Sequence, residues 1–202
     1  VLHAGIADGQ MFVATELCSG APASEFVGPA SRLRPDEVVA VGTQLASALT
    51  AVHAIGVLYR DLHTGNVLIA RGAEARAWLF DFDAAQVSPE FYAHLAERYA
   101  TPPEQRQEPA KDIDLRRADY VAPEVRAGGP YTTANDVFAL GLLLYRLLTG
   151  TRPFSPDGGE PAPAREHCTC PEALDTLLGA MLSPDPRGRP ALPQVTADLE
   201  DA

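Results

Sequence analysis

Residues 137–148 form the longest apolar stretch of this 202-residue chain, and they limit the possible folds more than any other segment. A helix over Thr133–Thr149 would carry further leucines away from its main apolar face, which consists of Val137, Leu140, Leu144 and Leu147. A helix that is apolar nearly all round is buried in a protein core. Gly141 and Arg146 interrupt the stretch, which is also shorter than the roughly 18 residues needed to span a membrane. We therefore expect a buried central helix that ends before Gly150.

A second long helix, amphipathic in character, is predicted over Pro35–Ile55. Apolar residues recur there at helical spacing, Asp36 and Glu37 occupy the first turn, and Gly56 follows the last turn. The composition also indicates helices over residues 88–99, 171–182 and 190–199. The predicted fold class is therefore mainly α, within an α+β arrangement that keeps a minority of strand.

Short apolar runs indicate small strands. Val57–Tyr59 and Val67–Ile69 flank a polar loop, and Ala77–Phe80 forms a third run. The β-rich segment Gln10–Leu17 follows a turn region and predicts a hairpin of two strands. The polar stretch from 102 to 111 contains several prolines and glutamines and is predicted to be a mobile loop.

Charge and cysteine content narrow the function classes. The net charge is −11, with 16 Lys and Arg against 27 Asp and Glu, so neither nucleic acid nor an anionic membrane is an expected partner. Three unevenly placed cysteines do not suggest a disulfide framework, which favours a reducing, intracellular and cytoplasmic setting. The length and the 46% hydrophobic content predict one domain with one substantial core.

The polar loop between the first two apolar runs carries the clearest chemical pattern. In Tyr59-Arg60-Asp61-Leu62-His63-Thr64-Gly65-Asn66, a carboxylate lies five residues before an amide, and Asp81-Phe82-Asp83 begins fifteen residues after that amide. The two segments resemble the catalytic loop and the metal-binding triplet of eukaryotic-type protein kinases of the Ser/Thr class. Three later segments resemble motifs of the same family in the same order: Tyr120-Val121-Ala122-Pro123-Glu124, residues 135–154 and residues 181–190.

The resemblance implies transfer of the ATP γ-phosphate to Ser or Thr hydroxyls of a protein substrate, with Mg²⁺ as the metal. It implies that Asp61 is the catalytic base and that Asn66 and Asp81 are magnesium ligands. Hard oxygen ligands suit magnesium, and phosphoryl transfer depends mostly on positioning and charge neutralisation. His63 stands where these kinases usually carry a phosphate-contacting Lys, so it is either a weaker phosphate contact or an ordinary loop residue.

The resemblance also implies a nucleotide pocket. Leu68 would form the floor below adenine, and Glu16 and Cys18 would offer hinge backbone groups beside Thr15 as a small gatekeeper. The implied organisation is a truncated kinase domain: residues 1–20 as the last N-lobe strands and hinge, 21–202 as the C-lobe, and about 81–124 as the activation segment. We expect that the Gly-rich loop and the strand Lys of the family precede Val1 in a longer parent protein.

Structural roles are implied for four other residues. Glu124 and Arg189 would form an ion pair, and Asp136 would cap the catalytic-loop backbone from the buried helix without meeting substrate. Arg60 suggests that a phosphate on the activation segment, for which Thr101 is a candidate, could order this region by pairing with the guanidinium.

Two alternatives to an active protein kinase stay open. Asp83 replaces the Gly that usually ends the metal-binding triplet, and together with His63 and the absent N-lobe it leaves room for a pseudokinase or regulatory binding module. The Gly65-Asn66 pair is similar to one in small-molecule kinases of the aminoglycoside-phosphotransferase type. The Ala122-Pro123-Glu124 segment and the predicted buried helix with Asp136 favour a protein kinase over that class.

Overall fold

The computed structural model describes residues 3–7, 10–72, 74–98, 119–155 and 159–202. Its helices are α1 (Pro35–Ala54), α2 (Pro89–Arg98), α3 (Pro123–Arg126), α4 (Thr133–Thr149), α5 (Glu172–Met181) and α6 (Leu192–Glu200). Its strands are β1 (His3–Ala7), β2 (Gln10–Ala14), β3 (Ala21–Pro22), β4 (Val57–Leu58), β5 (Val67–Ala70), β6 (Arg76–Leu79) and β7 (Gln86–Val87). Single 3-10 turns lie at Ala23–Phe26, Ala164–Glu166 and Pro186–Gly188.

Helix α4 is the centre of the core, as its apolar sequence predicts. Fourteen of its residues are buried, including Leu140, Leu143 and Leu144, which are fully inaccessible to solvent. Its first turn is closed by the Asn135 side chain, which accepts a hydrogen bond from the backbone N–H of Thr132. Gly150 ends the helix with φ +74°, a left-handed conformation that favours glycine. The predicted bounds of this helix are confirmed.

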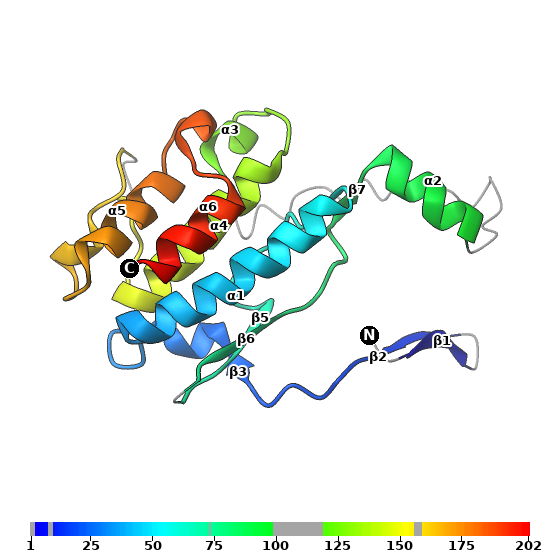
Figure 1. The fold of residues 1–202 in the computed structure, drawn as a ribbon, viewed down its shortest axis with the longest axis horizontal. Coiled ribbons are helices and arrows are strands. Elements are labelled where there is room, and N and C mark those ends of the chain that lie inside the picture. The colour runs from blue at the N-terminus through cyan, green and yellow to red at the C-terminus, as the bar shows by residue number, and fades with distance from the viewer. Residues whose placement is uncertain (1–2, 8–9, 73, 99–118, 156–158) are drawn as a thin grey trace.

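Helix α1 packs against both α4 and α6 (Figure 1). Gly42 lies at this contact, and a Cβ atom there would lie 2.9 Å from the terminal Cδ1 atoms of Leu144 and Leu199, so these two leucines would have to shift to admit one. The helix begins at Pro35 as predicted and ends one residue before the predicted end. Its buried Glu37 receives two hydrogen bonds from the Arg71 guanidinium, of 3.0 and 2.7 Å, and one from the backbone N–H of Arg34, which fixes the start of α1 to the turn after β5.

The strands form small antiparallel sheets, as the short apolar runs predict. Strands β3, β5 and β6 make a three-stranded sheet in that order, and β4 pairs with β7. In β5, Val67 and Ile69 are buried while Leu68 and Ala70 are half-buried, so one face of this sheet joins the core. The polar loop after β4 therefore leads directly into a strand that is anchored in the core.

Two elements lie at the side of the molecule away from α5 and α6. The hairpin β1–β2 and the helix α2 both extend from the helical body (Figure 1). The predicted hairpin is present, with His3 opposite Ala14, but its second strand ends at Ala14 and not at Leu17. Helix α2 occupies most of the predicted helix at 88–99. The loop predicted at 102–111 lies outside the described residues. None of the helices in the described part of the chain is both long and apolar enough to cross a bilayer.

Candidate active site

The polar loop after β4 rests on a buried carboxylate from α4. Asp136 is fully buried, and its two oxygens accept hydrogen bonds of 2.9 Å from the backbone N–H groups of Tyr59 and Arg60. The same oxygens also contact the Tyr131 hydroxyl and the His53 ring nitrogen Nε2, both at 2.7 Å. Breaking any of these hydrogen bonds would leave a buried polar group without a partner. The Asp136 carboxylate therefore holds the backbone of the loop in a fixed position.

Two residues of the predicted site, the neighbour of the catalytic base and a metal ligand, adopt left-handed backbone conformations. Arg60 has φ +71° and Asp81 has φ +62°, and they are the non-glycine residues with positive φ in the described part of the chain. Such a conformation costs about 1–2 kcal/mol for a residue with a Cβ atom. At Arg60 the hydrogen bond from its N–H to Asp136 helps to hold this geometry. Local backbone strain of this kind is typical of functional sites.

Asp61, Asn66 and His63 are brought together on the loop. The Asn66 amide nitrogen donates to the backbone oxygen of Asp61 at 3.0 Å and to its carboxylate at 3.1 Å. His63 is 7% exposed, and its Nδ1 accepts a 2.8 Å hydrogen bond from the Gly65 N–H, so a neutral ring carries its proton on Nε2. That Nε2 lies 3.6 Å from the Asp61 carboxylate, whose side chain is 24% exposed. The carboxylate is thus held in place while still reaching solvent.

The segment that contains Asp81 is joined to this loop through the preceding residue. The Phe80 N–H donates to the Asn66 carbonyl oxygen at 3.2 Å, and the Tyr59 hydroxyl donates to the Phe80 carbonyl oxygen. The Tyr59 ring also packs edge-on against Phe82, with 5.0 Å between centroids. Burial, and then the negative charge of Asp61, raise the pKa of Tyr59, so its hydroxyl stays protonated and remains a donor.

The donor set at this edge of the sheet fits a magnesium ion. Asp81 is exposed, and one of its oxygens accepts a 3.2 Å hydrogen bond from the Asp83 N–H. Because the Asn66 nitrogen is directed at Asp61, its amide oxygen is the arm with the chemistry of a cation ligand. One carboxylate and one amide oxygen are few ligands, but Mg²⁺ in phosphoryl-transfer sites keeps several waters and phosphate oxygens. The described residues contain no group of three or more His, Cys, Asp or Glu side chains able to hold a metal alone.

The predicted adenine-binding residues lie on two separate segments. Leu68 is on the half-buried face of β5, directly opposite Trp78 in the ladder with β6. The residues from Thr15 to Gly20 connect β2 to β3, and β3 pairs with β5 next to Leu68. Thr15 and Glu16 are exposed and Cys18 is half-buried. Among the described residues, no hydrogen bond joins these three to the catalytic loop.

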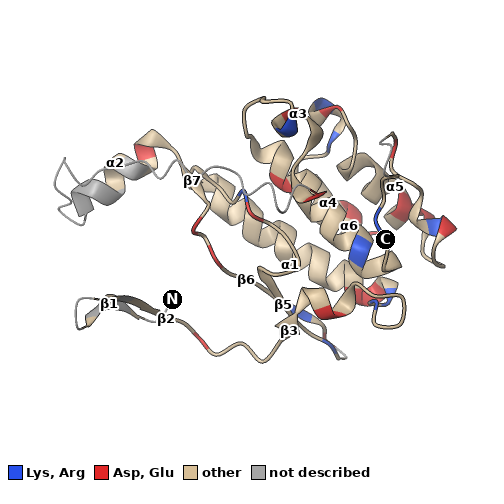
Figure 2. Cartoon of the chain, turned by 180° about the vertical axis from the view of Figure 1, so that it is seen from behind, with Lys and Arg blue, Asp and Glu red and all other residues tan. Residues whose placement is uncertain are grey.

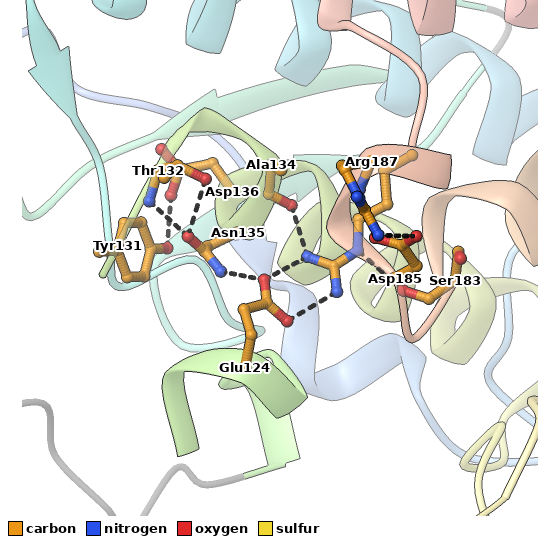
Figure 3. Close-up of polar contacts among 10 residues, drawn as sticks. Glu124, Tyr131, Thr132, Ala134, Asn135, Asp136, Ser183, Asp185 and Arg187 are labelled. Carbon is orange, nitrogen blue, oxygen red and sulfur yellow. Dashed lines mark hydrogen bonds and ion pairs between the residues drawn. The ribbon is translucent and has the colours of Figure 1, made fainter. Parts of the chain in front are cut away.

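Glu124 and Arg189 meet as an ion pair at the base of α4. The Arg189 guanidinium donates to both carboxylate oxygens of Glu124, at 2.7 and 2.8 Å, and the Asn135 amide donates to one of them (Figure 3). The Arg189 side chain is fully buried and also lies over the Phe138 ring. Although burial favours the neutral acid, the hydrogen bond from Arg189 holds the pKa of Glu124 below its ordinary value. The pair fixes α3 against α4 and the turn before α6.

Two partners of Asp136 were not identified from the sequence. His53 lies in the last turn of α1 and Tyr131 precedes α4, far from each other along the chain. Only their residue types could have indicated this role, because a buried His or Tyr beside an apolar segment needs a polar partner. Tyr59 could have been singled out in the same way, as a fully buried aromatic with a hydroxyl next to a polar loop.

Comparison with protein families decides the assignment, because the protein kinase domain model matches residues 3–198. The chain belongs to the protein kinase family. It is similar to two serine/threonine-protein kinases of Streptomyces coelicolor: PkaA, with 29% identity over 96% of this chain, and PkaB, with 34% identity over 84% of it. It is also 30% identical to the serine/threonine-protein kinase PknH of Mycobacterium bovis over 92% of the chain. The matched regions cover 35%, 40% and 30% of PkaA, PkaB and PknH, respectively.

The kinase fold is also seen in solved structures. The crystal structure of the Rad53 kinase domain and SCD2 in complex with AMPPNP superimposes with a TM-score of 0.65 at 22% identity. The match covers 89% of this chain and 64% of that chain. At this identity the likeness concerns the fold, so the roles of single kinase residues rest on the geometry described above.

Proposed function

We propose that this chain carries the catalytic base and metal-binding side of a Ser/Thr protein kinase, which transfers the γ-phosphate of ATP to a hydroxyl of a protein substrate. The observation that supports it best is the convergence of Asp61, Asn66 and the backbone of Phe80, next to Asp81. The carboxylate of Asp61, the amide of Asn66 and the backbone of Phe80 come from separate positions in the chain. They lie at the end of the β5–β6 ladder, which is anchored in the core. Family membership and the names of the relatives agree with this activity.

Asp61 is proposed to accept the proton of the attacking hydroxyl. Its carboxylate is fixed by Asn66 and lies near the surface, where a substrate side chain can approach it. As the hydroxyl oxygen bonds to the γ-phosphorus, its proton passes to Asp61 and ADP departs. Bound at Asn66 and Asp81, Mg²⁺ would neutralise phosphate charge. The buried His63 ring is proposed to support Asp61, since the Gly65 N–H directs its Nε2 toward that carboxylate.

The nucleotide side of the site is proposed to lie along β5. Leu68 and Trp78 present a half-buried apolar surface on the face of the sheet away from the core. The connection from Thr15 to Gly20 would supply backbone hydrogen-bond groups to the adenine, consistent with a hinge at the boundary of residues 1–20 and 21–202. The activation segment, about residues 81–124, is proposed to hold the substrate. Thr101, the candidate phosphosite on this segment, lies outside the described residues.

Two substitutions in the protein that carries this chain test these roles. Asp61→Asn should lower turnover by about 10²–10⁴-fold while nucleotide affinity stays nearly constant, because only proton transfer is lost. Asp81→Asn should also weaken magnesium-dependent nucleotide binding, since it removes a charged ligand. Turnover is measured with radiolabelled ATP, and binding is measured as a nucleotide-dependent thermal shift across a magnesium titration.

Asp83→Asn is the matched control, because it removes the same charge from the same exposed segment. If Asp83→Asn weakens magnesium dependence as much as Asp81→Asn does, the effect is one of total charge and the ligand assignment is wrong. If Asp61→Asn retains near-normal turnover, Asp61 is not the base. The absence of a thermal response to ATP and magnesium would favour the alternative of a pseudokinase or regulatory binding module.

A further inference from the structure

A cavity among the described residues lies away from the proposed catalytic groups. It has a volume of about 750 Å³ and lies between α3, α4 and the segment that follows α4. Its apolar lining includes Leu142, Pro153 and Phe154, and its basic lining consists of Arg126, Arg146 and Arg152. We call this cavity the arginine groove. Figure 2 shows the basic end of α3, where Arg126 is located.

The arginine groove is basic on a chain that is acidic overall. Three arginines line it against Asp119 and Glu160, whereas the whole chain has a net charge of −11. Asp119 already pairs with Arg152 at 2.8 Å. Within the described residues, neither Arg126 nor Arg146 has a carboxylate at ion-pair distance. Guanidinium groups that have no carboxylate partner among the described residues, beside an apolar floor, form a site suited to carboxylate side chains, because a planar guanidinium can donate two parallel hydrogen bonds.

A short series of contacts connects the arginine groove to the catalytic loop. The Arg146 guanidinium donates to the Tyr120 hydroxyl at 2.9 Å and lies over the Tyr120 ring. The Tyr120 ring faces the His63 ring at 6.2 Å, and His63 lies 3.6 Å from the Asp61 carboxylate. Together these contacts span on the order of 15 Å, which an extended peptide covers with about five residues. A substrate whose hydroxyl reaches Asp61 can therefore place a nearby side chain in the groove.

We propose that the arginine groove binds acidic side chains of the protein substrate, within about five residues of the hydroxyl that is phosphorylated. The groove thus selects Asp- and Glu-rich sequences around the target residue. The placement relative to Asp61 rests on the proposed kinase function, whereas binding of an acidic peptide to the groove does not require phosphate transfer.

The test measures binding without catalysis. Two fluorescent peptides carry Ala in place of the target Ser and differ only in having Glu or Gln at the flanking five positions on each side. Fluorescence anisotropy with the full chain, in the absence of ATP, should show about tenfold tighter binding of the Glu peptide at low salt and a smaller preference at high salt. Arg126→Gln combined with Arg152→Gln should remove most of this preference, and the corresponding double Lys variant should keep part of it.

Arg165→Gln is the matched control, because Arg165 is exposed to a similar degree as Arg152 but does not line the groove. The proposal is overturned if the two peptides bind equally well, or if the double Gln variant binds the Glu peptide like the unmodified chain. Self-association that the double Gln variant abolishes would also overturn it, since a second copy would then occupy the groove. If the peptides bind as expected but phosphate transfer is absent, the docking proposal stands and the proposed catalytic function fails.

Discussion

Replacement of Asp136 by Asn tests whether the catalytic loop depends on its buried support. One oxygen of Asp136 accepts hydrogen bonds from the Arg60 N–H and the Tyr131 hydroxyl. The other accepts a hydrogen bond from the Tyr59 N–H and contacts the His53 ring nitrogen. An amide group can replace only one of the two oxygens as an acceptor. A hydroxyl can accept instead of donate, and a histidine can do the same by changing its tautomer. A backbone N–H can only donate. Either orientation of the Asn side chain therefore leaves one buried backbone donor facing an NH₂ group.

The expected cost follows from this count. An unsatisfied buried donor costs about 1–3 kcal/mol, and the remaining hydrogen bonds lose the extra strength that a charged acceptor gives. We expect a total loss of about 3 kcal/mol in the free energy of unfolding, which corresponds to a fall in Tm of roughly 6–12 °C for a chain of this size. The loss should be larger for Asp136→Ala, since every one of the donors then lacks its acceptor.

Urea unfolding followed by circular dichroism measures the change in stability, and the nucleotide-dependent thermal shift reports on the catalytic loop. Asp201→Asn is the control, because Asp201 is an exposed carboxylate at the end of α6. It should change stability by less than about 0.5 kcal/mol. A loss below about 1 kcal/mol for Asp136→Asn would refute the argument that the two backbone donors depend on this carboxylate.

Three further outcomes are expected. The Glu124 pKa is lowered in the folded state, so its contribution to stability is present above pH about 4.5 and is lost as the pH falls through the folded value; an acid unfolding curve of Glu124→Gln should therefore be flatter in this range than that of the unmodified chain. Glu37→Gln should cost about 2 kcal/mol in urea unfolding, because the buried carboxylate loses its charged contact with Arg71, whereas an unchanged midpoint would contradict this. Gly65→Ala would place a Cβ atom 2.7 Å from the His63 ring, so turnover should fall by about tenfold to a hundredfold with a small change in Tm, and unaltered turnover would show that the ring position is unimportant.

Most of the fold was predictable because its signals are local. The leucines of α4 recur on every face, and Gly150 marks the end of the helix, so its bounds followed from periodicity and a single glycine. Strands β4, β5 and β6 followed in the same way from apolar runs next to polar turns, whereas the two-residue strands β3 and β7 were not predicted, because so short a segment carries no periodic signal. Helix ends such as that of α1 differed by a residue, because fraying and local hydrogen bonds decide the last turn.

The family resemblance implied the Glu124–Arg189 ion pair and the support of the catalytic loop by Asp136, whereas residue periodicity alone predicts the site only as a set of residue types. Asp61 and Asn66 are close in sequence, so their contact follows from a short loop. The shared partners of Asp136 come from positions 53, 59, 60 and 131, and no local pattern shows that these converge. The arginine groove has the same character, because Arg126, Arg146 and Arg152 become neighbours only when α3 packs beside α4. Long-range polar contacts depend on the three-dimensional arrangement of buried helices, which residue periodicity does not specify.

Helix α4 connects the catalytic loop to the arginine groove. It supplies Asp136 near its first turn, under the loop, and Arg146 ten residues later, beside Tyr120. A rise of about 1.5 Å per residue separates these positions by about 15 Å along the helix axis. Because α4 is buried along its length and cannot shorten or bend without disturbing the core, this spacing is fixed. The distance between the phosphorylated hydroxyl and the selected acidic side chain should therefore be a constant of the protein, and a peptide series that moves one Glu stepwise along the sequence should show a single sharp optimum.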